Sequence, residues 1–250
     1  MTATAPATSP ATAPAPADEV PWRIVTWNIR GAGRPDLSAL AAVIGRLRPD
    51  VVAIQEIRRG QATDLAARLG WNHQWTRKHH PYTPLGWWLA EGEAVLSRHP
   101  LRSATSRVIS PGVSTWTYRH RVLQSASVIR RGVTMRFHNT HLAAHDRPDE
   151  RIAQAERAAA FVGADGGELV VVAGDFNADH EAEVVRPFHA LGLRDPGGGP
   201  THPAIAPRRR FDYVLVPAAA EVIEQHEQFG GEEWAELSDH IPVLVEFHPA

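Results

Sequence analysis

The chain has 250 residues, of which 43% are hydrophobic, so it can bury a large core in one or two domains. Its formal net charge of -2 argues against tight nonspecific binding to a nucleic-acid backbone, which usually needs a strongly basic face. The absence of cysteine excludes disulfide bonds and thiolate metal sites, so any metal must be held by oxygen and imidazole ligands.

Residues 1–20 differ in composition from the rest of the chain. They alternate mainly Ala, Thr, Pro and Ser, a composition that predicts a disordered tail. They lack the basic start and apolar block of a secretory signal, and no apolar run approaches the roughly twenty residues that span a bilayer. We therefore expect a cytoplasmic protein without a membrane span, with residues 21–250 forming a single domain and no obligate protein partner.

Hydrophobic periodicity predicts strands and helices through the first half of the chain. The run Arg23–Ile29 is rich in β-branched and aromatic residues, and apolar residues recur at a helical period between positions 36 and 47. Short β-branched runs bounded by turn residues indicate further strands. The expected strands cover residues 23–29, 51–55, 71–76, 91–98 and 101–109, and the expected helices cover residues 36–47 and 61–69.

The second half begins with an expected hairpin, in which Arg130-Arg131-Gly132 tightly connects two antiparallel strands. Strands are expected over residues 121–129, 133–142, 211–216, 221–228 and 241–247, with another beginning at residue 169, and helices over residues 148–161 and 181–191. Some strands are thus joined by hairpins and others are separated by helices. This mixture indicates an α/β protein whose mixed sheets are covered by helices.

Polar groups able to bind metal or move protons recur where the predicted strands end. In the run Gly174-Asp175-Phe176-Asn177, Asp175 and Asn177 would share one face of an extended segment while Phe176 turns into the core. Taken alone, this stretch also fits a strand that runs into an Asx turn. The pattern recurs, however, at Asn28, Glu56, His141, Asp212 and Asp239-His240. Such a gathering of polar groups at strand ends favours a pocket.

Six short motifs resemble those of the endonuclease/exonuclease/phosphatase superfamily, which includes deoxyribonuclease-I-like enzymes, and they occur in the family's order. They are Thr26-Trp27-Asn28-Ile29, Gln55-Glu56, Asn139-Thr140-His141-Leu142, Gly174-Asp175-Phe176-Asn177, Phe211-Asp212-Tyr213-Val214-Leu215 and Ser238-Asp239-His240-Ile241-Pro242. The resemblance extends from about residue 22 to residue 247. It implies a four-layer αββα sandwich of two stacked mixed β-sheets flanked by helices, and a divalent metal at one end of the sandwich.

The resemblance also implies a metal site. Glu56 is similar to the family's principal metal carboxylate, and Asn28 and Asp239 are expected nearby, bound to the metal directly or through water. Oxygen ligands with several retained waters are what Mg²⁺ prefers, and Mn²⁺ is the alternative. The sequence leaves open whether one metal or two bind.

The catalytic roles are likewise implied by the resemblance. Asp175 would orient and activate the attacking water, and Asn177 would hold a phosphate oxygen as a substrate-binding residue. Asp212 and His240 resemble a carboxylate–histidine pair, which would let His240 act as a base or a transition-state stabiliser. Together they predict hydrolysis of a P–O bond by one in-line attack of water.

His141 would contact the phosphate or assist the leaving group. In some family members this histidine has its own carboxylate partner, and Glu91 is the candidate here. Glu93 lies two residues further on and would face the same side of the strand, so it remains the alternative.

The substrate is less well defined than the chemistry. Arg119 and Arg121 are candidate substrate-binding residues, although ordinary solvated arginines explain them equally well. Lys78 is the only lysine in the chain, and this arginine preference suits phosphate contacts but also fits a coding bias. We expect a nuclease-like phosphodiesterase acting on a phosphate ester, with nucleic acid among the candidates. Phospholipids of the sphingomyelin type, small phosphoesters and a catalytically silent binding module are the alternatives.

Overall fold

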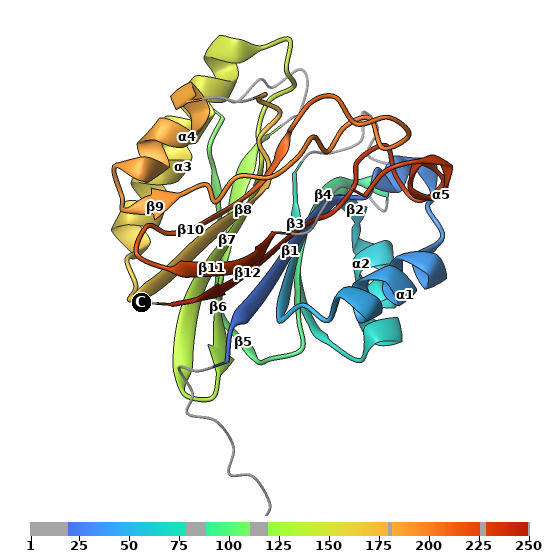
Figure 1. Cartoon of the computed structure of the whole chain (residues 1–250), viewed down its shortest axis with the longest axis horizontal. Coiled ribbons are helices and arrows are strands. Elements are labelled where there is room, and N and C mark those ends of the chain that lie inside the picture. The colour runs from blue at the N-terminus through green and yellow to red at the C-terminus, as the bar shows by residue number, and fades with distance from the viewer. Residues whose placement is uncertain (1–19, 79–88, 111–119, 180–181, 226–228, 250) are drawn as a thin grey trace, which may run out of the picture.

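The computed structural model describes residues 20–78, 89–110, 120–179, 182–225 and 229–249. Two six-stranded mixed sheets stack against each other, and helices cover their outer faces (Figure 1). The predicted α/β sandwich is therefore confirmed. Within the described residues, no helix is both long and apolar enough to cross a membrane.

Each sheet combines one parallel strand pair with antiparallel neighbours. The first sheet consists, in spatial order, of β11 (Glu221–Gln225), β12 (Val243–His248), β1 (Trp22–Asn28), β2 (Val51–Arg58), β4 (Glu91–Ser97) and β3 (Asn72–Arg77). The second consists of β5 (Leu101–Val108), β6 (Val122–Arg130), β7 (Val133–His141), β8 (Leu169–Asp175), β10 (Asp212–Pro217) and β9 (Leu193–Arg194). The parallel pairs are β1 with β2 and β7 with β8.

The helices form two outer layers. The first sheet is covered by α1 (Leu37–Leu47) and α2 (Arg59–Leu69), and the second by α3 (Pro148–Asp165) and α4 (Ala182–His189) (Figure 1). A 3-10 turn, η1 (Gly31–Gly33), follows β1, and the short α5 (Glu232–Ala235) precedes β12. Asp36 caps α1, because its carboxylate accepts hydrogen bonds from the backbone amides of Ser38 at 2.8 Å and Ala39 at 3.2 Å.

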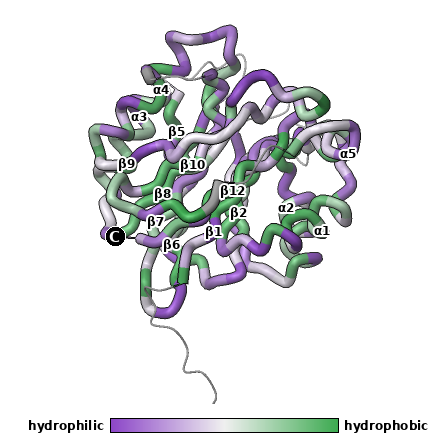
Figure 2. The backbone as a smooth tube through the Cα atoms, viewed as in Figure 1, coloured by the Kyte–Doolittle hydropathy of each residue, from purple (hydrophilic) through white to green (hydrophobic). Residues whose placement is uncertain are grey.

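Alternation of side chains along the strands builds three hydrophobic cores. Ile24 of β1 packs between the sheets, whereas its neighbour Val25 packs beneath α1 and α2. In β8, Val171 likewise faces the other sheet and Val172 faces α3 and α4. Hydrophobic residues concentrate along the central strands and hydrophilic residues in the surrounding loops (Figure 2). The period-2 pattern thus explains the four layers.

A polar contact crosses the apolar space between the sheets. The amide nitrogen of Gln55 on β2 donates to the side-chain oxygen of Asn139 on β7 at 2.8 Å. Asn139 in turn donates to the backbone oxygens of Ile54 and Ala94 at 3.2 and 3.1 Å. Both side chains are fully buried, so this satisfied pair fixes how one sheet sits on the other.

Several boundaries differ from the sequence-based expectation. β2 continues to Arg58, because a register shift between Ile54 and Ile57 lets the strand pass Glu56, whose φ is 55°. The helix expected to end at residue 161 runs to Asp165. η1, β9 and α5 were not expected, since two to four residues are too short to show a period. The expected end of the 221–228 strand lies partly outside the described residues.

Candidate active site

The parallel pairs bring polar strand ends to one edge of the sandwich. In register, Asn28 of β1 lies beside Gln55, and His141 of β7 lies beside Asp175 of β8. β10 runs antiparallel to β8, so its first residue, Asp212, also lies opposite Asp175. Strand order and register therefore gather side chains that are far apart in the sequence.

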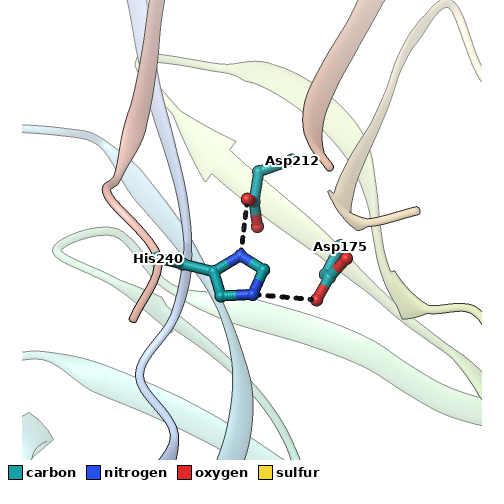
Figure 3. A group of neighbouring side chains, drawn as sticks. All are labelled: Asp175, Asp212 and His240. Carbon is teal, nitrogen blue, oxygen red and sulfur yellow. Dashed lines mark hydrogen bonds and ion pairs between the residues drawn. The ribbon is translucent and has the colours of Figure 1, made fainter. Parts of the chain in front are cut away.

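Asp175, Asp212 and His240 form the buried centre of this edge (Figure 3). The ring nitrogen Nδ1 of His240 is 2.8 Å from Oδ2 of Asp212, and Nε2 is 3.9 Å from Oδ2 of Asp175. The backbone around His240 is also fixed, because its carbonyl accepts a hydrogen bond of 2.9 Å from the indole of Trp27. The imidazole is thus held between two carboxylates.

The charges of this centre depend on one another. Burial alone would lower the pKa of His240, but the carboxylates of Asp212 and Asp175 outweigh it and raise the pKa to about 10. Burial, together with the like charge of Asp212, raises the pKa of Asp175. A pKa of about 10 makes His240 an imidazolium at neutral pH, with Nδ1 donating to Asp212 and the N–H of Nε2 left available.

Asn28 connects this centre to Glu56. Its amide nitrogen donates to Oδ2 of Asp175 at 2.9 Å, and its side-chain oxygen accepts from the amide of Arg30 at 3.0 Å. Burial raises the pKa of the Glu56 carboxyl, and the charges of Glu91 and Asp175 act in the same direction, whereas the charge of Lys78 and the hydrogen bond from Asn28 oppose them. The left-handed backbone of Glu56 is uncommon outside glycine, and such strain is typical of functional positions.

His141 is the second histidine close to Asp175. Its Nε2 is 3.5 Å from Oδ2 of Asp175 and 3.9 Å from Oε1 of Glu56. Arg121, one of the two arginines predicted to meet the substrate, donates to the backbone oxygen of His141 at 3.1 Å. The other, Arg119, lies outside the described residues.

Glu91 reaches His141 through a residue that the sequence pattern did not assign to the site. Oε1 of Glu91 is 2.6 Å from Nζ of Lys78, and that Nζ is 3.1 Å from Nδ1 of His141. Glu93, the alternative partner, is fully buried, and burial raises its pKa to about 8. Neither of its carboxylate oxygens has a hydrogen-bond partner among the described residues. The only sequence signal for Lys78 is that it is the sole lysine.

Asn177 lies in a turn rather than on the strand. β8 ends at Asp175, and Asn177 has a φ of 51°. Its amide donates to Oδ1 of Asp175 at 2.9 Å, and its side chain donates to the backbone oxygen of Leu142 at 3.1 Å. Phe176 points into the core as expected. The expectation that Asp175 and Asn177 share one face of an extended segment is therefore wrong for Asn177: a buried strand delivers Asp175, and an Asx turn holds Asn177 beside it.

The residues present fit a divalent cation. Asp175 and Asp212 each offer a ligand atom, as does His240 when its ring is neutral, and these atoms lie within 4.8 Å of one another. Oδ1 of Asp212 is buried and has no hydrogen-bond partner among the described residues. A cation would also relieve the crowding of buried carboxylates that raises the pKa values of Asp175 and Glu56. Asp239, predicted to assist the metal, has 37% of its side chain exposed and lies 3.5 Å from Arg30.

The sequence and the fold were each compared with those of known proteins. Residues 25–240 match the sequence model of the Endonuclease/Exonuclease/phosphatase family. A family member from Beutenbergia cavernae DSM 12333 superposes with a TM-score of 0.74 and 24% identity, covering 93% of this chain and 72% of that one. One from Bacteroides vulgatus gives a TM-score of 0.78 at 19% identity, covering 93% of this chain and 100% of that one.

A mannosyl-6-phosphatase from Bacteroides thetaiotaomicron VPI-5482 gives a TM-score of 0.71 at 18% identity, covering 90% of this chain and 99% of that one. No curated protein matches the chain. The structural likenesses concern the fold, whereas the family match spans the site residues from Asn28 to His240. The chain belongs to the endonuclease/exonuclease/phosphatase family and is a hydrolase of phosphoric esters.

Proposed function

We propose that this protein is a divalent-metal-dependent phosphodiesterase with nuclease-like chemistry. One observation carries the proposal: two histidines converge on a single carboxylate oxygen. Nε2 of His141 and Nε2 of His240 lie 3.5 and 3.9 Å from Oδ2 of Asp175. A carboxylate placed between two imidazoles suits a reaction in which water loses a proton while negative charge grows on the phosphate.

Asp175 is the proposed base. Burial raises its pKa and so makes the carboxylate a better proton acceptor, while Asn28 and the amide of Asn177 hold both of its oxygens in place. A water that donates to this carboxylate would be aimed at phosphorus for in-line attack. Positioning and proton removal would thus be performed by the same group.

His240 is the proposed stabiliser of the transition state. As an imidazolium fixed by Asp212, it would donate from Nε2 to a nonbridging phosphate oxygen, where negative charge develops. His141 would donate to the phosphate or to the leaving group. Asn177 and Arg121 would complete the contacts to the phosphate.

We propose Glu56 as the main metal ligand, assisted by Asn28 and Asp239. Asp212 and His240 are already engaged with each other at 2.8 Å, and a protonated His240 has no lone pair to offer a metal, whereas Oε1 of Glu56 lies 3.9 Å from Nε2 of His141, beyond hydrogen-bonding distance. When bound, Mg²⁺ or Mn²⁺ would neutralise charge on the phosphate oxygens.

The proposal is tested by hydrolysis of bis-p-nitrophenyl phosphate with Mg²⁺ or Mn²⁺, followed by plasmid DNA, RNA, sphingomyelin and phosphoinositides. We expect turnover that a chelator abolishes, and a loss of about 10²- to 10⁴-fold in kcat for His240→Ala. The exposed His189 provides a matched control, so His189→Ala should retain full turnover. Hydrolysis that persists in chelator, or near-normal kcat in His240→Ala, would contradict the proposal, and the substrate panel identifies the ester class.

A further inference from the structure

Lys78 is the only lysine in the chain, and it is 5% exposed. It follows β3 directly, and the backbone holds it on both sides. Its amide donates to the backbone oxygen of Glu91 at 2.9 Å, and its carbonyl accepts from the amide of His120 at 3.1 Å. Since lysine is almost never fully buried unless it is paired, this position requires an explanation.

The pairing of Lys78 links a carboxylate to an imidazole. Its Nζ is 2.6 Å from Oε1 of Glu91 and 3.1 Å from Nδ1 of His141. Burial and the charge of Arg121 lower the pKa of Lys78, and Glu91 opposes both. The short contact with a carboxylate requires Nζ to donate there, and an ammonium group has donors only.

This donor determines where the proton of His141 lies. If Lys78 donates to Nδ1, that nitrogen must be the acceptor of the neutral ring, and the ring proton must be on Nε2. The surroundings of Nε2 agree, because its neighbours at 3.5 and 3.9 Å are the carboxylate oxygens of Asp175 and Glu56, which are acceptors. Both edges of the ring therefore call for the same tautomer.

We propose that Lys78 is a positioning residue that holds the proton of His141 on Nε2, so that His141 donates a hydrogen bond to the phosphate and does not act as a base. The Nδ1 atoms of the two histidines then have opposite hydrogen-bonding roles. His240 donates from Nδ1 to Asp212, whereas His141 accepts at Nδ1 from Lys78. The part of this inference that concerns phosphate rests on the proposed function, but the part that concerns the tautomer does not.

A lysine suits this position better than an arginine. The compact ammonium on a flexible stem can meet an imidazole and a carboxylate at different angles, whereas a guanidinium is a rigid, planar fork. All other lysine-or-arginine positions in the chain are occupied by arginine. Lys78 therefore lies at a position where an arginine would not meet the same geometry. We expect Lys78→Arg to keep the positive charge without keeping the Nε2 tautomer of His141.

The direct test is nitrogen NMR of the histidine rings, which does not require activity. Protein labelled with ¹⁵N-histidine is compared with His141→Gln to assign the ring, and with Lys78→Met to remove the donor. We expect Nδ1 of His141 to be unprotonated and Nε2 protonated in the native protein, and this pattern to be lost in Lys78→Met. A doubly protonated ring, a proton on Nδ1, or an unchanged pattern in Lys78→Met would overturn the proposal.

The second test restores the amine chemically. Because the chain has no cysteine, Lys78→Cys can be alkylated selectively after unfolding and then refolded. Bromoethylamine rebuilds a lysine-like amine, whereas iodoacetamide leaves a neutral amide of similar length. We expect the first product to recover the His141 tautomer and the second not to, with circular dichroism confirming that both have refolded.

The functional readout uses the same proteins and bis-p-nitrophenyl phosphate. We expect Lys78→Met to lower kcat by about 10²-fold with little change in KM, because the lost hydrogen bond belongs to the transition state. The aminoethylated protein should recover most of this loss, and the exposed Arg77 serves as the control through Arg77→Met. Equal kcat for the two alkylated proteins would contradict the role of Lys78. If no ester is hydrolysed at all, the proposed function fails while the NMR result still decides the tautomer.

Discussion

His138 shows how a single buried side chain couples this protein to pH. It is fully buried on β7, and its neighbour Phe137 faces the other sheet, so His138 faces the helical layer. Nδ1 lies 2.8 Å from the hydroxyl of Ser125, whereas Nε2 has no partner among the described residues. Burial, assisted by the charge of Arg136, lowers the pKa of His138 to about 3.

This depressed pKa predicts a loss of stability in acid. Between its folded pKa of about 3 and its unfolded value of 6.5, only the unfolded state binds the proton, so stability falls as the pH drops through 6.5. We expect protonation of His138 in the unfolded state to lower the unfolding free energy by about 2 kcal/mol between about pH 7 and about pH 5. His138→Leu should abolish this part of the pH dependence of the unfolding free energy. Urea denaturation at the two pH values measures it. An equal slope in His138→Leu would disprove the assignment, and the exposed His189→Leu should keep the full slope.

Residue types at strand ends were sufficient to locate most of the candidate site. Asn28, Glu56, His141, Asp175 and Asp212 lie together, as their places at the ends of predicted strands suggested. The roles assigned to them remain predictions. Periodicity was unable to distinguish Glu91 from Glu93, because both project to the same side of a strand. Lys78 was missed because its partners come from other strands, and a contact between strands leaves no local signal.

At the scale of elements, the approach of β7 to β8 depends on one glycine. Gly174 has a φ of 152°, and a Cβ built on it would lie 1.9 Å from the backbone oxygen of Thr140. The same close pairing brings His141 into register with Asp175. The glycine of this motif therefore serves the geometry of the site as well as the turn.

We expect Gly174→Ala to be severely destabilising, because the methyl group would overlap a backbone atom that cannot move away. A cost of about 3 kcal/mol combines overpacking with an unfavourable φ. Gly132→Ala is the matched control, since Gly132 has a φ of 84° and a Cβ added to it would have nothing within 4 Å, so only the backbone cost of about 1 kcal/mol should remain. Thermal denaturation of the two variants separates the two contributions, and equal losses would show that the close approach is unimportant.

Hydrophobic periodicity predicted most helices and strands, and the elements that it missed have a common cause. The two-residue β9 and the four-residue α5 are defined by what they pair with or cap, not by a repeating pattern. The extension of β2 beyond Glu56 depends on a register shift against β4. Such features result from pairing between distant segments, which a single sequence does not display.

At the scale of the whole molecule, the site belongs to neither sheet alone. Asn28 and Glu56 come from the first sheet, whereas His141, Asp175 and Asp212 come from the second. The buried contact between Gln55 and Asn139 lies one residue from Glu56 and two residues from His141, and fixes the sheets against each other there. The geometry of the site therefore depends on how the two sheets are stacked.

The predicted tail should be dispensable for that stacking. We expect deletion of residues 1–19 to leave both Tm and kcat unchanged. Trp22, by contrast, is buried between the sheets with the guanidinium of Arg130 3.9 Å above its ring. Trp22→Ala should therefore cost about 3–5 kcal/mol. Denaturant unfolding of the two proteins measures both effects, and a destabilised deletion would show that the tail contributes to the fold.

The pairing of β1 with β12 has a consequence for the synthesis of the protein. Among the described residues, the first strand, β1, lies between β2 and the last strand, β12, and β12 follows His240 closely. During translation, the first sheet must wait for its final member to leave the ribosome, and the backbone that carries His240 is secured only then. A nascent chain that ends before β12 therefore lacks the strand that secures this backbone, and it should not hydrolyse phosphoric esters.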